Sequence, residues 1–556
     1  MPVKPVSVMP WHKPEPHKPL KMQDKAAFKE RLLDHNASLD VDSPMSPIAL
    51  STIICTITEK NSDPELIGEM ISFGMKVARF DMNYTTASDQ AILIKKFRSG
   101  VLEYSKKIRK VCTVAIAIEL KGTVISIGAF HNNVEKLNLK AGEVIMLSAS
   151  RAYDDCGTNE RIYVDYDELP SILQPKDKLY LHYGRIELQV RGVVDNDIVC
   201  EIVTGGNLPP HTELTVLGVP LNLSAITEKD VEDLNFALDA EVDAIIIPMV
   251  RTGSSVDEVR DILGDRGRHI ALIPKVDSRQ AYDFFNDILR ASDGLIVNRG
   301  RLSVELSTEK VMQAQKSMVA RANKAGKPVY AVTEYLNSMI HENCPTFAEA
   351  TDVINAVIEG VDGLILEEET AIGDHPGVVV QTLSQLCREA ESQIWQSDIY
   401  STLTNAAAPP VDPAHAICMA AVESSLKAHA SGIIVVTTSG KSAILIARYR
   451  PRCPVFAVTR YGAVARKMNL YKSVLPVHVL SPPHPCWSKD VDLRMQEGID
   501  YGKAINIIKP GDALILVNSW RPGAGFTNNI RIVYASIDEP WVLPVSLDDQ
   551  LFDKME

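Results

Sequence analysis

The sequence contains no Cys-x-x-Cys pair. Its nine cysteines stand far apart, at positions 55, 112, 156, 200, 344, 387, 418, 453 and 486. Zinc sites of the finger or ribbon type take their cysteines in closely spaced pairs, so this absence argues against a zinc cluster. An odd, scattered set in a long chain is typical of reduced thiols, which favours a cytoplasmic protein.

Long apolar runs are missing as well. No stretch approaches the ~20 apolar residues of a membrane-spanning helix. Residues 1–25 are rich in Pro, Lys and His, without the apolar core of a secretory signal. Basic residues are outnumbered, 58 Lys and Arg against 71 Asp and Glu, which gives a net charge of −13. Because phosphate binding needs clustered Lys and Arg, we expect no nucleic-acid partner, and we expect no membrane.

What the sequence does contain is a repeated βα pattern. The 556 residues allow roughly three domains at ~100–200 residues each. Short β-branched runs alternate with segments of helical period, such as 228–240 and 308–325. The runs are 53–57, 77–83, 114–120, 244–250, 269–277, 294–300, 328–334 and 363–369. Runs this apolar are buried on both faces, as in a parallel sheet. We therefore predict an α/β chain with a (β/α)8 TIM barrel.

The pattern is interrupted in the middle and changes near the end. More than a hundred residues separate the third and fourth runs, and they contain short alternating strands with Gly/Pro turns, which predicts an inserted small β-barrel lid domain. Beyond residue 395 helices and strands restart as a C-terminal α/β domain. The expected division is a largely flexible extension (1–46), with one short helix over 25–35, the barrel (47–122 and 225–395), the lid (123–224) and the C-terminal domain (396–556).

Ionisable side chains gather where the barrel strands are expected to end. In a barrel of this kind, chemistry lies at the carboxyl ends of the strands. Those ends carry Arg79, Asp81, Asn83, Glu119, Lys121, Lys275, Asp277, Arg299, Arg301, Thr333, Glu334, Glu367 and Glu369. One such residue would mean little, but this many predict a functional mouth.

The same segments resemble pyruvate kinase. The likeness rests on stretches such as "GMKVARFDMNY", "IPKVDS", "ASDGLIVNRGRLSVEL", "NKAGKPVYAVTEYLNSMI" and "NSWRPGAGFTNNIR", in order from about Leu39 onward, and "LDVDSP" at 39–44 is similar to the animal branch. The resemblance implies transfer of a phosphoryl group from phosphoenolpyruvate to ADP, giving pyruvate and ATP. It also implies Mg²⁺ (or Mn²⁺), K⁺ and a tetrameric assembly.

The resemblance assigns roles to individual residues. Lys275 falls on the catalytic lysine, Thr333 on the proton-transfer threonine and Arg79 on an arginine of the site. Arg299 and Gly300 fall on the substrate-binding stretch. Asp277 stands where the family has a glutamate ligand of the divalent ion. Asp81, Asn83 and Glu119 fall on altered potassium ligands.

Several positions depart from the family pattern. Arg301 replaces the second metal-binding carboxylate of "RGDLG", so a cation stands where the family has an anion. Ser126 replaces the arginine of "KGPEIR", Pro248 replaces a serine near the phosphate, and His182-Tyr183-Gly184 replaces "DDG" in the lid. We interpret His182 as structural rather than as a new general base.

A loop in the C-terminal domain is better preserved. Gly440-Lys441-Ser442 matches the end of the P-loop pattern, but the first glycine of that pattern would fall at 435, which is Val, so a nucleotide P-loop is excluded. The loop instead resembles the phosphate loop of the family's fructose-1,6-bisphosphate site, where backbone N–H groups form an anion nest. The residues implied are Thr437, Thr438, Ser439, Gly440, Lys441, Ser442, Trp487, Arg494, Arg521 and Gly525.

Three hypotheses follow. The first is a glycolytic pyruvate kinase with strongly impaired turnover. The second is a catalytically inactive subunit that binds fructose-1,6-bisphosphate and assembles as a homotetramer or with an active relative. The third is a different reaction of phosphoenolpyruvate or oxaloacetate, which would keep Lys275 and Thr333 but rely less on the altered phosphate contacts.

Overall fold

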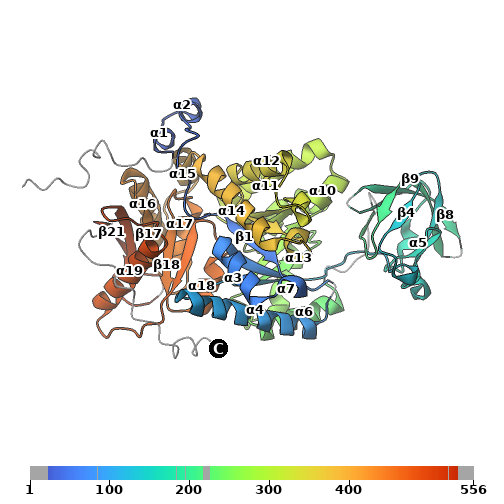
Figure 1. Cartoon of the computed structure of the whole chain (residues 1–556), viewed down its shortest axis with the longest axis horizontal. Helices are drawn as coiled ribbons and strands as arrows, with labels where there is room; N and C mark the ends of the chain where they lie inside the picture. Colours follow the sequence, from blue (N-terminus) through green and yellow to red (C-terminus); the bar gives the residue numbers. More distant parts are fainter. Residues whose placement is uncertain are drawn as a thin grey trace, which may run out of the picture.

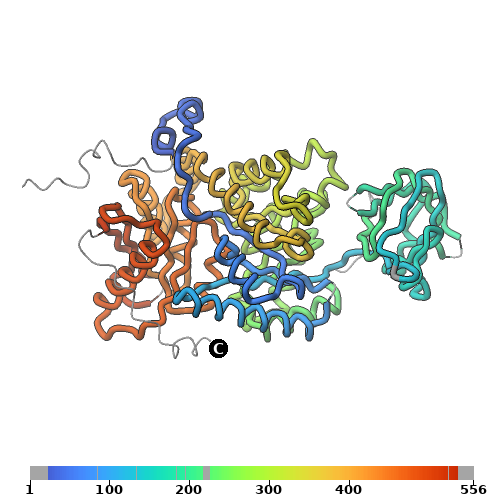
Figure 2. Tube along the Cα trace, viewed as in Figure 1, coloured from blue at the N-terminus to red at the C-terminus, as the bar shows by residue number. Residues whose placement is uncertain are grey.

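The computed structural model describes residues 23–83, 85–182, 184–194, 196–216, 226–523 and 525–535. Three bodies follow one another in space: the inserted β domain at one end, the barrel in the middle and the C-terminal domain at the other end (Figure 1). The trace in Figure 2 shows that the chain leaves the barrel for the inserted domain and later returns to it. Across the described residues, no helix has the length and apolar character needed to span a membrane.

The central body is a closed barrel of eight parallel strands, as predicted. The strand order is β1-β16-β15-β14-β13-β12-β3-β2. The strands are β1 (Thr52–Thr56), β2 (Met75–Asp81), β3 (Ala115–Glu119), β12 (Ala244–Ile247), β13 (Ala271–Val276), β14 (Leu295–Asn298), β15 (Val329–Val332) and β16 (Gly363–Leu366). The helices around them are α3 (Pro64–Phe73), α4 (Ala87–Ile108), α6 (Glu228–Asp239), α7 (Gly253–Leu263), α8 (Arg279–Asp283), α9 (Phe285–Ala291), α10 (Arg299–Glu305), α11 (Thr308–Ala325), α12 (Phe347–Ile358), α13 (Glu368–Ala371) and α14 (Pro376–Ser392).

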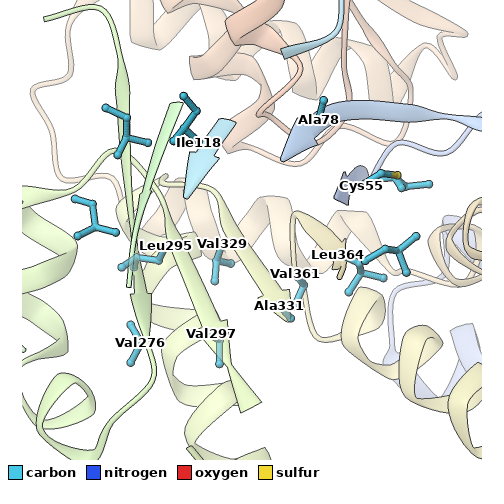
Figure 3. Close-up of a cluster of buried hydrophobic side chains, with 14 of the residues drawn as sticks. Cys55, Ala78, Ile118, Val276, Leu295, Val297, Val329, Ala331, Val361 and Leu364 are labelled. Carbon is cyan, nitrogen blue, oxygen red and sulfur yellow. The ribbon is translucent and has the colours of Figure 1, made fainter. Parts of the chain in front are cut away.

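Successive strand residues pack into two separate cores. Ile53 and Cys55 of β1 lie in the layer between the strands and the helices, whereas Ile54 lies in the cluster that fills the barrel. This alternation follows from the two-residue period of a strand. Figure 3 shows part of the outer layer, with side chains from several strands. Because both faces of these strands are covered, their sequences are continuous apolar runs. This pattern allowed the strands to be predicted from the sequence.

The inserted domain is a small barrel-like sheet with its own apolar core. Six strands pair in the order β11-β7-β8-β9-β5-β6. Ser126 bridges to Glu213, next to β11, and Ile127 bridges to Val164, next to β6, so the segment at 126–127 connects the two outer strands. A second sheet pairs β10 with β4. The elements are β4 (Leu137–Leu139), β5 (Val144–Ser148), β6 (Arg161–Tyr163), α5 (Leu169–Ile172), β7 (Lys178–Leu181), β8 (Ile186–Val194), β9 (Asp197–Thr204), β10 (Gly206–Leu208) and β11 (Leu214–Val216).

The C-terminal domain is a five-stranded sheet covered by helices. Its order is β19-β18-β17-β20-β21, with β21 antiparallel. The elements are α15 (Gln396–Asn405), α16 (Pro413–Lys427), β17 (Gly432–Val436), α17 (Lys441–Arg448), β18 (Val455–Thr459), α18 (Gly462–Met468), β19 (Val474–His478), α19 (Trp487–Ala504), β20 (Ala513–Ser519) and β21 (Thr527–Tyr534). Strand β19 was not predicted, since Pro476 interrupts its apolar run.

A turn of the C-terminal domain closes the base of the barrel. Leu470 belongs to the cluster that fills the barrel, and its carbonyl accepts a hydrogen bond from the Tyr330 hydroxyl. Asn469 Nδ2 donates to the Thr113 carbonyl at 2.7 Å, and the Ser473 N–H donates to the Leu50 carbonyl at 3.0 Å. These contacts lie at the amino ends of the barrel strands, opposite the predicted mouth.

The described part of the N-terminal extension is folded. We expected one helix over 25–35, but the chain forms α1 (Asp24–Ala27) and α2 (Leu32–Ala37). The break lets the buried His35 ring reach back to the Ala26 carbonyl at 2.9 Å, while its other nitrogen faces the Gln393 carbonyl at 2.9 Å. The remainder of the extension, residues 1–22, lies outside the described residues.

Candidate active site

The carboxyl ends of β2, β3, β13 and β16 bring two cations and three carboxylates together. Arg79 donates from Nε to Glu119 Oε2 at 2.5 Å and from Nη2 to Asp81 Oδ2 at 2.9 Å. Lys275 Nζ lies 2.6 Å from Glu119 Oε1, and Glu367 Oε1 lies 3.3 Å from both cations. Arg79, Lys275 and Glu119 are buried. The expected catalytic cations are therefore already paired within the protein.

The charges in this cluster stabilise one another. Burial alone would lower the pKa of Lys275 and of Arg79, but the carboxylates of Glu119 and Glu367 raise both. Burial would likewise raise the pKa of Glu119, yet Arg79 and Lys275 hold it at about 2. The three groups are therefore ionised at neutral pH, and an incoming anion must compete with Glu119 and Glu367 for the same two cations.

The residues expected to hold potassium do not fit that role here. Both Glu119 oxygens contact cations of the protein, and Asp81 Oδ1 accepts a hydrogen bond from the Asn83 backbone N–H at 2.9 Å. Asp81 Oδ2 is the oxygen that pairs with Arg79. These oxygens of Glu119 and Asp81 therefore already have partners within the protein.

The expected divalent-ion site fails a similar test. Asp277 is buried, its Oδ2 accepts from the Met249 N–H at 2.9 Å, and its Oδ1 has no hydrogen-bond partner among the described residues. One such oxygen would suit a cation. However, Arg301 lies beside it, and in the described parts of the chain no three His, Cys, Asp or Glu side chains are grouped to hold a metal. The residues present do not fit a divalent ion.

The remaining predicted residues lie near the mouth with other partners. Arg299 forms a two-point ion pair with Asp352 of α12 and stacks on the Tyr335 ring, 5.0 Å from its centroid. Gly300 lies in α10, and Thr333 is half-buried just after β15. The His182 ring faces the Arg185 guanidinium at 3.2 Å. Tyr183 lies outside the described residues.

Three carboxylates that matter here were not assigned a role from the sequence. Glu367 was visible as a strand-end residue, but its pairing with Lys275 was not. Asp352 of α12 and Glu213 of the lid gave no signal, because each meets its arginine only across a tertiary contact. Glu213 Oε2 pairs with Arg301 Nη2, which joins the lid to the barrel mouth.

A second candidate site lies at the loop after β17. Eight of the predicted residues line one pocket there: Thr437, Thr438, Ser439, Lys441, Ser442, Trp487, Arg494 and Gly525. Gly440 has a φ of +82° and donates its N–H to the Thr437 hydroxyl at 3.0 Å, which shapes the turn. Arg521 instead stacks on Phe526, 3.6 Å from the ring centroid.

One carboxylate orders the basic side of this pocket. Asp490 accepts from Arg460 through both oxygens, at 3.0 and 2.8 Å, and pairs with Arg494 at 2.7 Å. Burial would raise the pKa of Asp490, but these arginines hold it at about 2. Arg494 also stacks on Trp487, 5.2 Å from the ring. The two arginines thus share one carboxylate, and Arg494 lies at the pocket next to the hydroxyls of the loop.

Comparison with known proteins agrees with this architecture. Residues 49–380 match the family model "Pyruvate kinase, barrel domain", and residues 415–533 match "Pyruvate kinase, alpha/beta domain". Pyruvate kinase PKLR of Homo sapiens is 36% identical over 512 residues, covering 92% of this chain and 89% of the relative. Pyruvate kinase 1 of Trypanosoma brucei brucei is 31% identical, covering 90% of this chain and 99% of the relative. This chain therefore belongs to the pyruvate kinase family of phosphotransferases.

Proposed function

We propose that this protein is a pyruvate kinase family member whose turnover of phosphoenolpyruvate and ADP is strongly impaired. The observation that carries the proposal is the internal pairing of Lys275 and Arg79 with Glu119 and Glu367. Two unit charges ~4 Å apart interact by about 4 kcal/mol at an effective dielectric of ~20. Because about 1.4 kcal/mol corresponds to tenfold in rate, competition of this size removes several decades.

The surroundings of Asp277 support the same proposal. A divalent ion neutralises transferring phosphate and is held by carboxylates. Here Arg301 stands next to the one expected carboxylate ligand, and Asp81, Glu119 and Glu367 add negative charge to the mouth. At this mouth, the carboxylates that would repel an anionic substrate outnumber the cations that could bind it. Of the expected catalytic residues, the chain supplies the buried Lys275 and Arg79 and the hydroxyl of Thr333.

The first prediction concerns turnover. Purified full-length protein with phosphoenolpyruvate, ADP, K⁺ and either Mg²⁺ or Mn²⁺ is expected to form pyruvate at least about a thousandfold more slowly than a family relative assayed alongside. Lys275→Met is the matched control for any residual rate that arises at this site. Family-like pyruvate formation that disappears in Lys275→Met would overturn the proposal.

A single reversion separates the causes of the impairment. Arg301→Asp alone is expected not to restore family-like rates, because the pairing of Lys275 with Glu119 remains and Ser126 still binds Asp165 in the lid. Full recovery in this variant would place the whole defect at position 301. The same assay run with oxaloacetate tests the third hypothesis.

A second function is favoured by the pocket at the loop after β17. We infer that it binds fructose-1,6-bisphosphate and that the protein acts as a regulatory subunit, assembled with itself or with an active relative. Hydroxyls, backbone N–H groups, Lys441 and Arg494 there suit a phosphate. Asp412 lies 3.9 Å from Lys441, but both side chains are largely exposed, so this pair costs an entering phosphate little.

The second prediction is a ligand-induced thermal shift. Fructose-1,6-bisphosphate at about 100 times its Kd is expected to stabilise the C-terminal domain by about 2.7 kcal/mol, since a ligand that binds only the folded state shifts unfolding by mass action. Differential scanning calorimetry should show that domain's transition rise. Lys441→Ala should lose most of the shift, whereas Lys427→Ala, which changes an exposed lysine of α16, should keep it. A shift of equal size in Lys441→Ala would rule out this pocket.

A further inference from the structure

One guanidinium of the barrel forms an ion pair with a carboxylate of the lid. Arg301, in α10, pairs through Nη2 with Glu213, the residue before lid strand β11. Its Nη1 contacts the sulfur of Met249, whose backbone N–H donates to Asp277 at 2.9 Å. Arg301 and Glu213 keep only 14% and 23% of their side-chain surface exposed, so solvent screens this group weakly.

Both carboxyl groups depend on that cation. Burial raises the pKa of Glu213 and of Asp277, and Arg301 is the strongest of the charges that oppose the rise, ahead of Lys275. Glu213 and Asp277 also repel each other. Without a cation between them, the lid residue and the barrel residue would therefore disfavour each other's approach.

Two other ion pairs join the two bodies, and both are weaker. Lys121, after β3, lies 3.8 Å from Asp165 of the lid, and both side chains are partly exposed. Arg185 in the lid turn donates to both oxygens of Glu334 at 2.9 Å, and these side chains are 56% and 46% exposed. Exposed pairs of this kind contribute little to stability and are screened by salt. Breaking a mostly buried pair costs more, because one charge is left uncompensated where solvent screens it weakly. The contact at Arg301 is therefore the main electrostatic tie.

We propose that Arg301 is a positioning residue, a built-in cation that ties the lid to the barrel by neutralising Glu213 and Asp277 together. The orientation of the lid is consequently independent of divalent metal ions. This inference concerns lid position and does not depend on the turnover rate.

Hydrogen exchange of the full-length protein tests the tie. In the wild type, exchange of the lid base, residues 206–216, is expected to be the same in Mn²⁺ as in EDTA. In Arg301→Asp the new carboxylate is added to those of Glu213 and Asp277. Because the three repel one another, exchange in EDTA should accelerate by at least about tenfold. Mn²⁺ should reverse that acceleration, and titration followed by the electron paramagnetic resonance of free Mn²⁺ should show uptake that the wild type lacks.

Conservative variants separate charge from packing. Arg301→Lys keeps the cation and should keep slow, metal-independent exchange, whereas Arg301→Met should exchange rapidly with or without Mn²⁺. Glu213→Gln removes the lid partner and gives a second route to the same loosening if Arg301→Asp does not fold. Arg185→Gln, the matched control at the exposed pair, should change exchange little.

Two results would overturn the proposal. One is a wild-type lid whose exchange slows on adding Mn²⁺, since that would show that a metal ion already holds the lid. The other is unchanged exchange in both Arg301→Met and Glu213→Gln, because the lid would then be held by contacts other than this cation.

Discussion

Glu119→Gln is expected to destabilise the barrel by about 3–5 kcal/mol, because it leaves two buried cations short of their shared carboxylate. Glu119 accepts from Arg79 at 2.5 Å and contacts Lys275 at 2.6 Å, and all three side chains are almost fully buried. Asp81 and Glu367 remain but are closer to solvent. Gln keeps the size of the side chain, so the loss reports charge rather than a cavity.

The measurement should follow the barrel itself. A chain with several domains does not unfold in two states, so hydrogen exchange of the β2 and β3 amides is a better readout than one melting curve. The matched control is Asp283→Asn, which removes an exposed pair with Arg279 and should cost less than about 0.5 kcal/mol. Equal effects of the two substitutions would show that the buried cluster contributes no net stability.

The same cluster predicts acid sensitivity. The folded-state pKa of Glu119 is held at about 2 by Arg79 and Lys275, despite burial, and the unfolded value is ~4.3. For a depressed carboxyl pKa, the stabilisation is fully present above the unfolded value and is lost as pH falls towards the folded value. Barrel exchange should therefore accelerate between about pH 4.3 and pH 2, and less so in Glu119→Gln.

Glu369→Gln is expected to stabilise the protein in alkaline solution by several kcal/mol. Glu369 follows β16, is 2% exposed and accepts from the Glu367 N–H at 2.8 Å. Burial raises the pKa of Glu369 to about 8, with Glu367 and Glu368 adding to the rise. Between ~4.3 and about 8 the folded state holds a proton that the unfolded state releases, so stability falls as pH increases across this range.

Gln removes this titration and keeps an acceptor for the Glu367 N–H. Wild type and variant should therefore unfold alike near pH 5, with the variant more resistant by pH 9. Denaturant unfolding at the two pH values checks this difference. A gap between the proteins that stays constant across pH would contradict the buried, protonated state of Glu369.

The sequence predicted more of the fold than of the site. The end of each predicted barrel run lies within a few residues of the end of an observed strand. A strand covered on both faces has an unbroken apolar sequence, which makes it easy to recognise. Strand β19 lacked that pattern. Placement of Arg79, Lys275 and Asp277 at strand ends was also predictable, since topology alone brings those ends together.

Pairing between side chains was not predictable. Arg299 was placed on the substrate-binding stretch by resemblance, and its ion pair with Asp352 gave no signal in the sequence. Arg301 was recognised as a cation in place of a metal-binding carboxylate, but its contact with Glu213 across the lid boundary could not be inferred from residues so distant in sequence. Side-chain direction and long-range contacts depend on tertiary packing, which local patterns do not encode.

The turn at 469–473 also bears on how this protein can be divided by recombination or cloning. Leu470 supplies part of the barrel's interior. Its neighbours Ser473 and Lys472 donate hydrogen bonds to the carbonyls of Leu50 and Val361, which precede strands β1 and β16. A gene fragment that ends after α14 would encode a barrel with an open, apolar floor. The barrel and the C-terminal domain are therefore expected to be inherited together. A recombination crossover between them would give a functional barrel only if the turn at 469–473 stayed with the barrel.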